Sequence, residues 1–101
     1  MIDLEPRWIE LVKTILERRV PGCEVRAFGS RVSGGAKKHS DLDLAIVGAV
    51  KLDLGTLARL REDFAESDLP MRVDVLDWHG ISDEFRAVIG RRYEVLSKPA
   101  G

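Results

Sequence analysis

Residues 28–44 read FGSRVSGGAKKHSDLDL, and this stretch decides how the chain is interpreted. Ten residues separate the Gly29-Ser30 pair from an Asp-x-Asp pair at Asp41 and Asp43. The segment between them has no acidic residue, and its basic side chains are Arg31, Lys37, Lys38 and His39. A Gly-Ser turn after a strand exposes backbone N–H groups and a hydroxyl to an anion, and glycine permits close approach. This stretch therefore predicts a site for a metal-bound polyphosphate, where phosphates need cations and metals need carboxylates.

The spacing of the two aspartates predicts a divalent metal site. On a strand over residues 41–47, Asp41 and Asp43 project from one face with Cα atoms roughly 6.6 Å apart. Like charges held this close repel, and a cation between them relieves the repulsion. Oxygen ligands without a Cys or His cluster favour Mg²⁺, or Mn²⁺, over zinc. An Asp-x-Asp pair alone is also typical of an exposed strand start. The complete Gly-Ser-x10-Asp-x-Asp pattern is more specific, because it arises by chance on the order of once in a thousand chains of this size.

A third carboxylate, Asp74, lies within an expected strand over residues 71–76. Aspartate is disfavoured in strands, so its position needs an explanation. If this strand lies beside the Asp-x-Asp strand, Asp74 completes a three-carboxylate cluster that could hold two metal ions about 3.5–4 Å apart. The alternative is an ion pair between Asp74 and Arg72 or Arg26. Asp77 has the opposite parity and is expected to cap the next turn.

Apolar periodicity and turn residues predict an α+β fold with the element order α-β-β-α-β-α. The first helix begins near Pro6 and ends before Pro21-Gly22. The expected strands cover residues 23–28, 41–47 and 71–76, the later helices cover 53–66 and 82–92, and 93–96 form a short edge strand. A single helical turn is expected at residues 30–32. We expect one domain over residues 1–101, a small mixed sheet with helices packed mainly on one face.

Composition excludes several classes of protein. The chain has 101 residues and a net charge of -1, from 16 basic and 17 acidic side chains, which argues against a dedicated duplex-binding protein. One cysteine, Cys23, excludes an internal disulfide and a Cys-based zinc site. No apolar run approaches the ~20 residues that span a bilayer, and the acidic N-terminus is unlike a signal peptide. We expect a cytoplasmic protein without a membrane or direct nucleic-acid partner.

At these residues the sequence resembles the minimal nucleotidyltransferase (MNT) family of the DNA polymerase β superfamily. The matching elements are Gly29-Ser30-Arg31, the ten-residue spacing, Ser40-Asp41-Leu42-Asp43-Leu44 and Val73-Asp74-Val75-Leu76. The likeness covers essentially the whole chain, since the first and last helices also fall where that family has them. The resemblance implies the polymerase β-like nucleotidyltransferase fold.

The resemblance also implies a role for each motif residue. Asp41 and Asp43 would bind two Mg²⁺ ions, and Asp74 would share one and orient or deprotonate the acceptor hydroxyl. The β- and γ-phosphates of a nucleoside triphosphate would be held by Gly29 and Ser30, with an additional contact from Arg31. The reaction would be attack of a hydroxyl on the α-phosphorus with release of pyrophosphate.

The family's biology implies a protein partner. Many members are antitoxins encoded beside a HEPN-domain toxin ribonuclease, and they transfer AMP from ATP to a tyrosine of that toxin. The resemblance therefore implies ATP and a HEPN toxin as partners, in a hetero-oligomer. The alternative is an antitoxin that blocks its toxin by binding and occlusion, with catalysis incidental.

Overall fold

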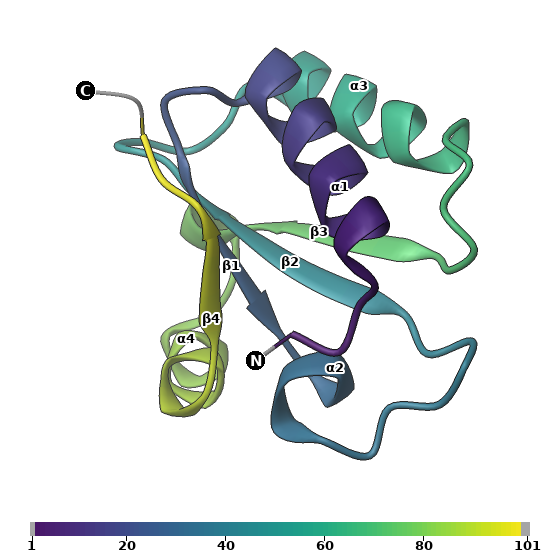
Figure 1. Ribbon diagram of the computed structural model, residues 1–101. Helices are drawn as coiled ribbons and strands as arrows, with labels where there is room; N and C mark the ends of the chain where they lie inside the picture. The colour runs from purple at the N-terminus through teal and green to yellow at the C-terminus, as the bar shows by residue number, and fades with distance from the viewer. Residues whose placement is uncertain (1, 100–101) are drawn as a thin grey trace.

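The computed structural model describes residues 2–99. Its helices are α1 (Pro6–Arg19), α2 (Ser30–Ser33), α3 (Leu54–Ala65) and α4 (Asp83–Arg91), with a 3-10 turn η1 (Trp78–Gly80). Its strands are β1 (Glu24–Phe28), β2 (Leu42–Val47), β3 (Val73–Asp77) and β4 (Glu94–Ser97). They form one mixed sheet in the order β3-β2-β1-β4, in which β2 is parallel to β3 and antiparallel to β1 (Figure 1). The predicted α+β fold is confirmed, including the helical turn at α2 and the edge strand β4.

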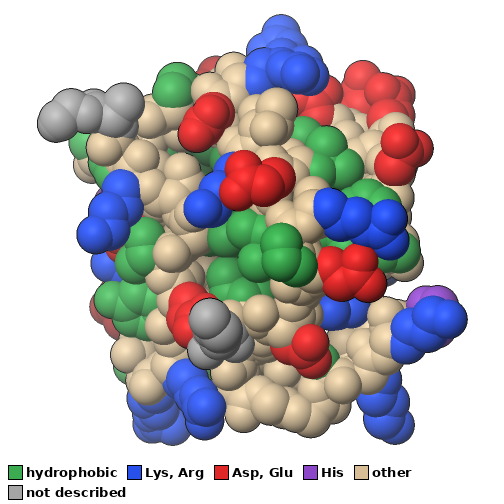
Figure 2. Space-filling view, viewed as in Figure 1, with side chains coloured by type: hydrophobic (Ala, Val, Ile, Leu, Met, Phe, Trp, Pro, Cys, Tyr) green, Lys and Arg blue, Asp and Glu red, His purple; other side chains and the backbone are tan. Residues whose placement is uncertain are grey.

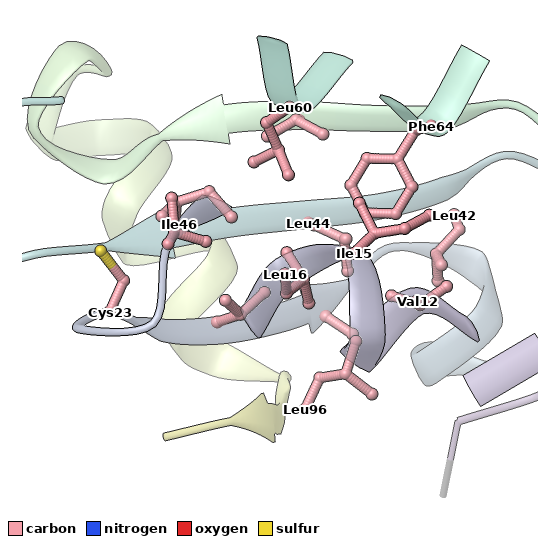
Figure 3. Packing of buried hydrophobic residues seen from close by; sticks show 14 of the residues in the cluster. Val12, Ile15, Leu16, Cys23, Leu42, Leu44, Ile46, Leu60, Phe64 and Leu96 are labelled. Carbon is pink, nitrogen blue, oxygen red and sulfur yellow. The ribbon is translucent and has the colours of Figure 1, made fainter. Parts of the chain in front are cut away.

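One face of the sheet carries the hydrophobic core. α1 and α3 lie side by side across this face (Figure 1). Alternate residues of β2 point toward the two helices, and they are the fully buried Leu42, Leu44 and Ile46. Figure 3 shows them packed with Val12, Ile15 and Leu16 of α1 and with Leu60 and Phe64 of α3. Burying each such side chain contributes roughly 1.5–3 kcal/mol. Because strand side chains alternate, the odd-numbered residues of β2 must face the other side of the sheet.

The other face of the sheet is covered in part by α4 and η1. Phe28 of β1 contacts Phe85 of α4 edge-to-face, with ring centroids 6.0 Å apart. The Arg26 guanidinium lies 4.8 Å from the Trp78 ring centroid and 4.6 Å from that of Tyr93. These contacts cover the sheet around β1 and leave the β2–β3 side of the same face to the carboxylates.

Side-chain caps fix the starts of three helical segments, and the sequence predicted the cap at Asp77. The side chains of Asp53, Asp77 and Ser82 accept hydrogen bonds from the amides of Thr56, His79 and Phe85, respectively. Each bond satisfies one of the free N–H groups at a helix start. Asp77 is thus a capping residue and lies on the buried side, whereas Asp74 does not cap a helix.

The third strand begins two residues later than predicted. β3 covers Val73–Asp77, whereas the sequence predicted residues 71–76. A strand needs a partner, and β2 begins only at Leu42, whose register partner is Val73. Met71 instead is buried in the core.

The surface agrees with the balanced charge of the chain. Figure 2 shows acidic and basic side chains interspersed on the visible face, with hydrophobic side chains between them. None of the helices within residues 2–99 is long and apolar enough to cross a membrane.

Candidate active site

The parallel pairing of β2 and β3 brings two of the predicted carboxylates together. Asp43 and Asp74 are register partners, so their Cα atoms lie on adjacent strands about 4.8 Å apart and their side chains share a face. Asp41 comes directly before β2 and has the same parity as Asp43. The sheet therefore brings Asp43 and Asp74 together, and Asp41 lies close enough for its charge to act on Asp43.

The electrostatics of Asp43 reflect this crowding. Its side chain is half-buried. Burial raises the pKa of Asp43, and the negative charges of Asp74 and Asp41 raise that pKa further. A cation beside a carboxylate in this environment stabilises its charged form.

The alternative ion-pair partners of Asp74 can now be placed. Arg72 lies 3.8 Å from the Asp74 carboxylate, and the side chains of both residues are mostly exposed, at 75% and 51%. An exposed pair at this distance is weak and leaves the carboxylate free to bind other groups. Arg26 is paired with Glu24 of the same strand.

The Gly-Ser turn packs directly against Asp43. Gly29 follows the last residue of β1, Phe28, whose register partner is Asp43. Gly29 has a φ of 80°, a conformation that side chains rarely adopt, and a Cβ there would collide with Oδ2 of Asp43. Only glycine therefore fits, and the two halves of the sequence motif meet in space.

Arg31 has partners that the sequence did not predict. Its side chain is buried and donates to three backbone carbonyls, those of Asp3 at 2.8 Å, Ser40 at 2.9 Å and Lys38 at 3.3 Å. The Arg31 carbonyl accepts from the Asp3 amide at 2.6 Å. These bonds tie the ten-residue segment to the N-terminal segment, and they do not support the expected phosphate contact. No local signal could have revealed this role, because Asp3 lies 28 residues away.

The donor set of the site suits a hard cation. Within residues 2–99, no group of three His, Cys, Asp or Glu side chains stands ready-made to hold a metal ion. Asp41, Asp43 and Asp74 nevertheless offer only carboxylate oxygens, the ligands that Mg²⁺ and Mn²⁺ prefer. The negative charge that raises the pKa of Asp43 is also the charge that a divalent ion would neutralise.

Comparisons with known proteins identify the family. The profile of the nucleotidyltransferase domain family matches residues 9–96. A probable protein adenylyltransferase, MntA, from Haemophilus influenzae is 50% identical over 97 residues, which cover 96% of this chain and 85% of that protein. A crystal structure of a toxin-antitoxin with AMP-PNP matches with a TM-score of 0.76 and 24% identity, over 89% of this chain and 73% of the matched one. A tri-AMPylated Shewanella oneidensis HEPN toxin in complex with MNT antitoxin matches with a TM-score of 0.68 and 22% identity, over 89% of this chain and 69% of the matched one. The resemblance noted in the sequence is confirmed: the chain belongs to the nucleotidyltransferase domain family and is a nucleotidyltransferase.

Proposed function

We propose that this chain is an antitoxin that transfers AMP from ATP to a tyrosine hydroxyl of a HEPN-domain toxin, with residues 1–101 acting as one catalytic domain. The observation that carries the proposal is the pairing of Asp43 with Asp74 beside Gly29. The name of the Haemophilus influenzae relative, protein adenylyltransferase, supports transfer to a protein. The complex of an AMPylated HEPN toxin with its MNT antitoxin supports the choice of partner.

In this proposal the Gly-Ser turn holds the triphosphate. Gly29 lacks a side chain, so phosphate oxygens can approach the backbone closely. The Ser30 hydroxyl is a donor for the β- or γ-phosphate. Hydrogen bonds from the amides of Val32 and Ser33 to the Gly29 carbonyl close the turn that presents these groups. Arg31 is left out of the phosphate site and holds the loop instead.

Asp41, Asp43 and Asp74 would bind two Mg²⁺ ions, for which Mn²⁺ could substitute. When bound, such ions neutralise charge on the triphosphate and on the pyrophosphate that leaves. Asp74 is the more exposed member of the Asp43–Asp74 pair, and it orients the acceptor hydroxyl and receives its proton. The hydroxyl oxygen forms a bond to the α-phosphorus while the bond from that phosphorus to pyrophosphate breaks.

Mass spectrometry of a HEPN-domain toxin produced together with this chain tests the proposal. Toxin produced with the wild-type chain should carry AMP on a tyrosine, and toxin produced with Asp41→Asn or Asp43→Asn should not. Asp68→Asn, on the exposed loop after α3, is the matched control and should transfer AMP like the wild type. Unmodified toxin beside the wild-type chain would contradict the proposal. Full neutralisation by Asp43→Asn without any AMP would favour occlusion.

A further inference from the structure

β3 is a free edge of the sheet beside the candidate active site. In the order β3-β2-β1-β4, it has a strand neighbour on one side only. The Leu42 amide donates to the Arg72 carbonyl at 2.9 Å. Backbone groups of alternate residues point to the same side in such a ladder, so those of Asp74 also point toward β2. The N–H and C=O groups of Val73 and Val75 therefore point out from the open edge.

A groove of about 570 Å³ runs along this edge, between β3, the last turns of α3 and the loop that joins them. Phe64, Leu69 and Val73 give it apolar walls, and Asp74 also lines it. The Arg61 guanidinium donates to the Val75 carbonyl at 2.9 Å, so the edge already binds one donor from outside the sheet. The groove and the candidate active site thus share one carboxylate.

We propose that the toxin segment that carries the acceptor hydroxyl binds in this groove as an added strand along β3. The proposal rests on the proposed function, because it assigns Asp74 to the acceptor. An added strand lies about 4.8 Å from β3, and the residue beside Asp74 projects from the same face as Asp43 and Asp74. A tyrosine at that position directs its hydroxyl over the carboxylates. Asp74 is the one of the three carboxylates that lines this groove.

The groove also defines the chemistry of the segment. Side chains on either side of the tyrosine point the opposite way, toward Phe64 and Leu69, and should be apolar. Arg61 and Arg72 are exposed at the rim, so an acidic side chain near either end of the segment complements the groove. The expected acceptor is therefore an extended apolar-tyrosine-apolar stretch flanked by an acidic residue.

Two variants block the groove in different ways. Ala65→Glu places a charged side chain on the α3 wall, and Ala58→Glu is its matched control, because Ala58 is exposed on the same helix and outside the groove. Val73→Pro removes an outward N–H without removing a bond of the β2–β3 ladder. With the HEPN-domain toxin used in the transfer test, Ala65→Glu and Val73→Pro should weaken binding by at least about tenfold, measured by calorimetry. Ala58→Glu should bind like the wild type, and the affinity of all three variants for Mg²⁺-ATP should stay unchanged.

Hydrogen exchange of the complex reports directly on the backbone amides at the open edge of β3. Toxin binding should slow exchange of the Val73 and Val75 amides. The inference alone fails if the wild-type chain transfers AMP while these amides exchange as before, or if Ala65→Glu binds toxin as well as Ala58→Glu does. A dimer of this chain that Ala65→Glu dissociates would assign the edge to a second copy and would also overturn the inference. Absence of AMP transfer by the wild type is a separate result, which overturns the proposed function.

Discussion

A half-buried carboxylate such as Asp43 is stable in its charged form only when a cation or several donors lie beside it. Neighbouring Asp41 and Asp74 add further negative charge, and the pKa of Asp43 is raised by burial first and by these charges second. Asp43 therefore destabilises the metal-free fold at neutral pH, which is the expected signature of a residue kept for binding.

Replacing Asp43 by asparagine should separate stability from activity. A carboxyl with a raised folded pKa stabilises the fold below its unfolded pKa, about 3.9, and loses that contribution as the pH rises through the folded pKa. Asparagine cannot ionise, so Asp43→Asn should raise the free energy of unfolding at pH 7 without metal, and the difference should vanish below about pH 4. Urea unfolding at the two pH values measures this. Transfer of AMP should fall by more than about a hundredfold. A variant less stable than the wild type at pH 7 would contradict the argument.

Arg31→Lys distinguishes a structural arginine from a phosphate ligand. Lysine keeps the charge but cannot reach the carbonyls of Asp3, Lys38 and Ser40 together. Because buried carbonyls lose their donors, we expect the free energy of unfolding to fall by about 1–3 kcal/mol. Arg59→Lys, on the exposed side of α3, is the control and should change little. A raised KM for ATP with unchanged urea unfolding would instead support the predicted contact between Arg31 and phosphate.

The sequence could predict the positions of the carboxylates but not their surroundings. The two-residue period of a strand predicted that Asp41 and Asp43 share a face, but β2 begins at Leu42, so only Asp43 lies within the strand. The position of Asp74 opposite Asp43 depends on which strands pair. The sequence predicted it only if the strand of Asp74 lies beside the Asp-x-Asp strand. The burial of Arg31 was not predictable, because its partners are backbone carbonyls that the folded chain brings together.

At the scale of elements, one ion pair joins the two helices that cover the core. Arg19 of α1 donates to Asp63 of α3 at 2.6 Å and 3.2 Å. The Arg19 hydrogen bond lowers the pKa of Asp63. A carboxyl with a lowered folded pKa stabilises the fold above its unfolded pKa and loses that contribution as the pH falls through the folded value.

Asp63→Asn should therefore lower stability at neutral pH and have little effect in acid. The urea midpoint of the variant should lie below that of the wild type at pH 7, and the two should converge as the pH is lowered below about 3.9. Asp68→Asn is the control, since it lies on the loop after α3 and outside this pair. Equal midpoints at pH 7 would show that the pair between α1 and α3 contributes nothing.

Helix positions were easier to predict than strand partners. Caps such as Asp53 and Ser82 are local signals, and both lie at the starts of the helices predicted over residues 53–66 and 82–92. The order β3-β2-β1-β4 depends on long-range pairing, and the first residue of β3 is set by Leu42 on another strand. Local patterns carry no information about such a partner, which explains the shifted start of β3.

For the domain as a whole, the free energy of ligand binding adds to the free energy of unfolding. The core lies on the α1–α3 side of the sheet, whereas the carboxylates lie on the side that α4 and η1 cover only in part. A ligand held by Asp41, Asp43 and Asp74 binds the folded chain only, because the unfolded chain does not bring these residues together. Ligand binding must therefore raise the stability of the entire domain.

Thermal unfolding with Mg²⁺-ATP measures this coupling. At a hundred times its Kd, a ligand adds about 2.7 kcal/mol to the free energy of unfolding, and for a domain of this size each kcal/mol raises Tm by about 4–8 °C. We expect a rise in Tm of about 10–20 °C for the wild type. The rise should be absent in the double variant Asp41→Asn/Asp43→Asn and much smaller when EDTA removes the metal. Mg²⁺ with AMP is the matched ligand control, because AMP lacks the phosphates proposed to contact Gly29 and Ser30. If AMP raises Tm as much as ATP does, the Gly-Ser turn does not contribute to ATP binding. If ATP raises Tm of the double variant as much as it raises Tm of the wild type, the carboxylates do not contribute to ATP binding.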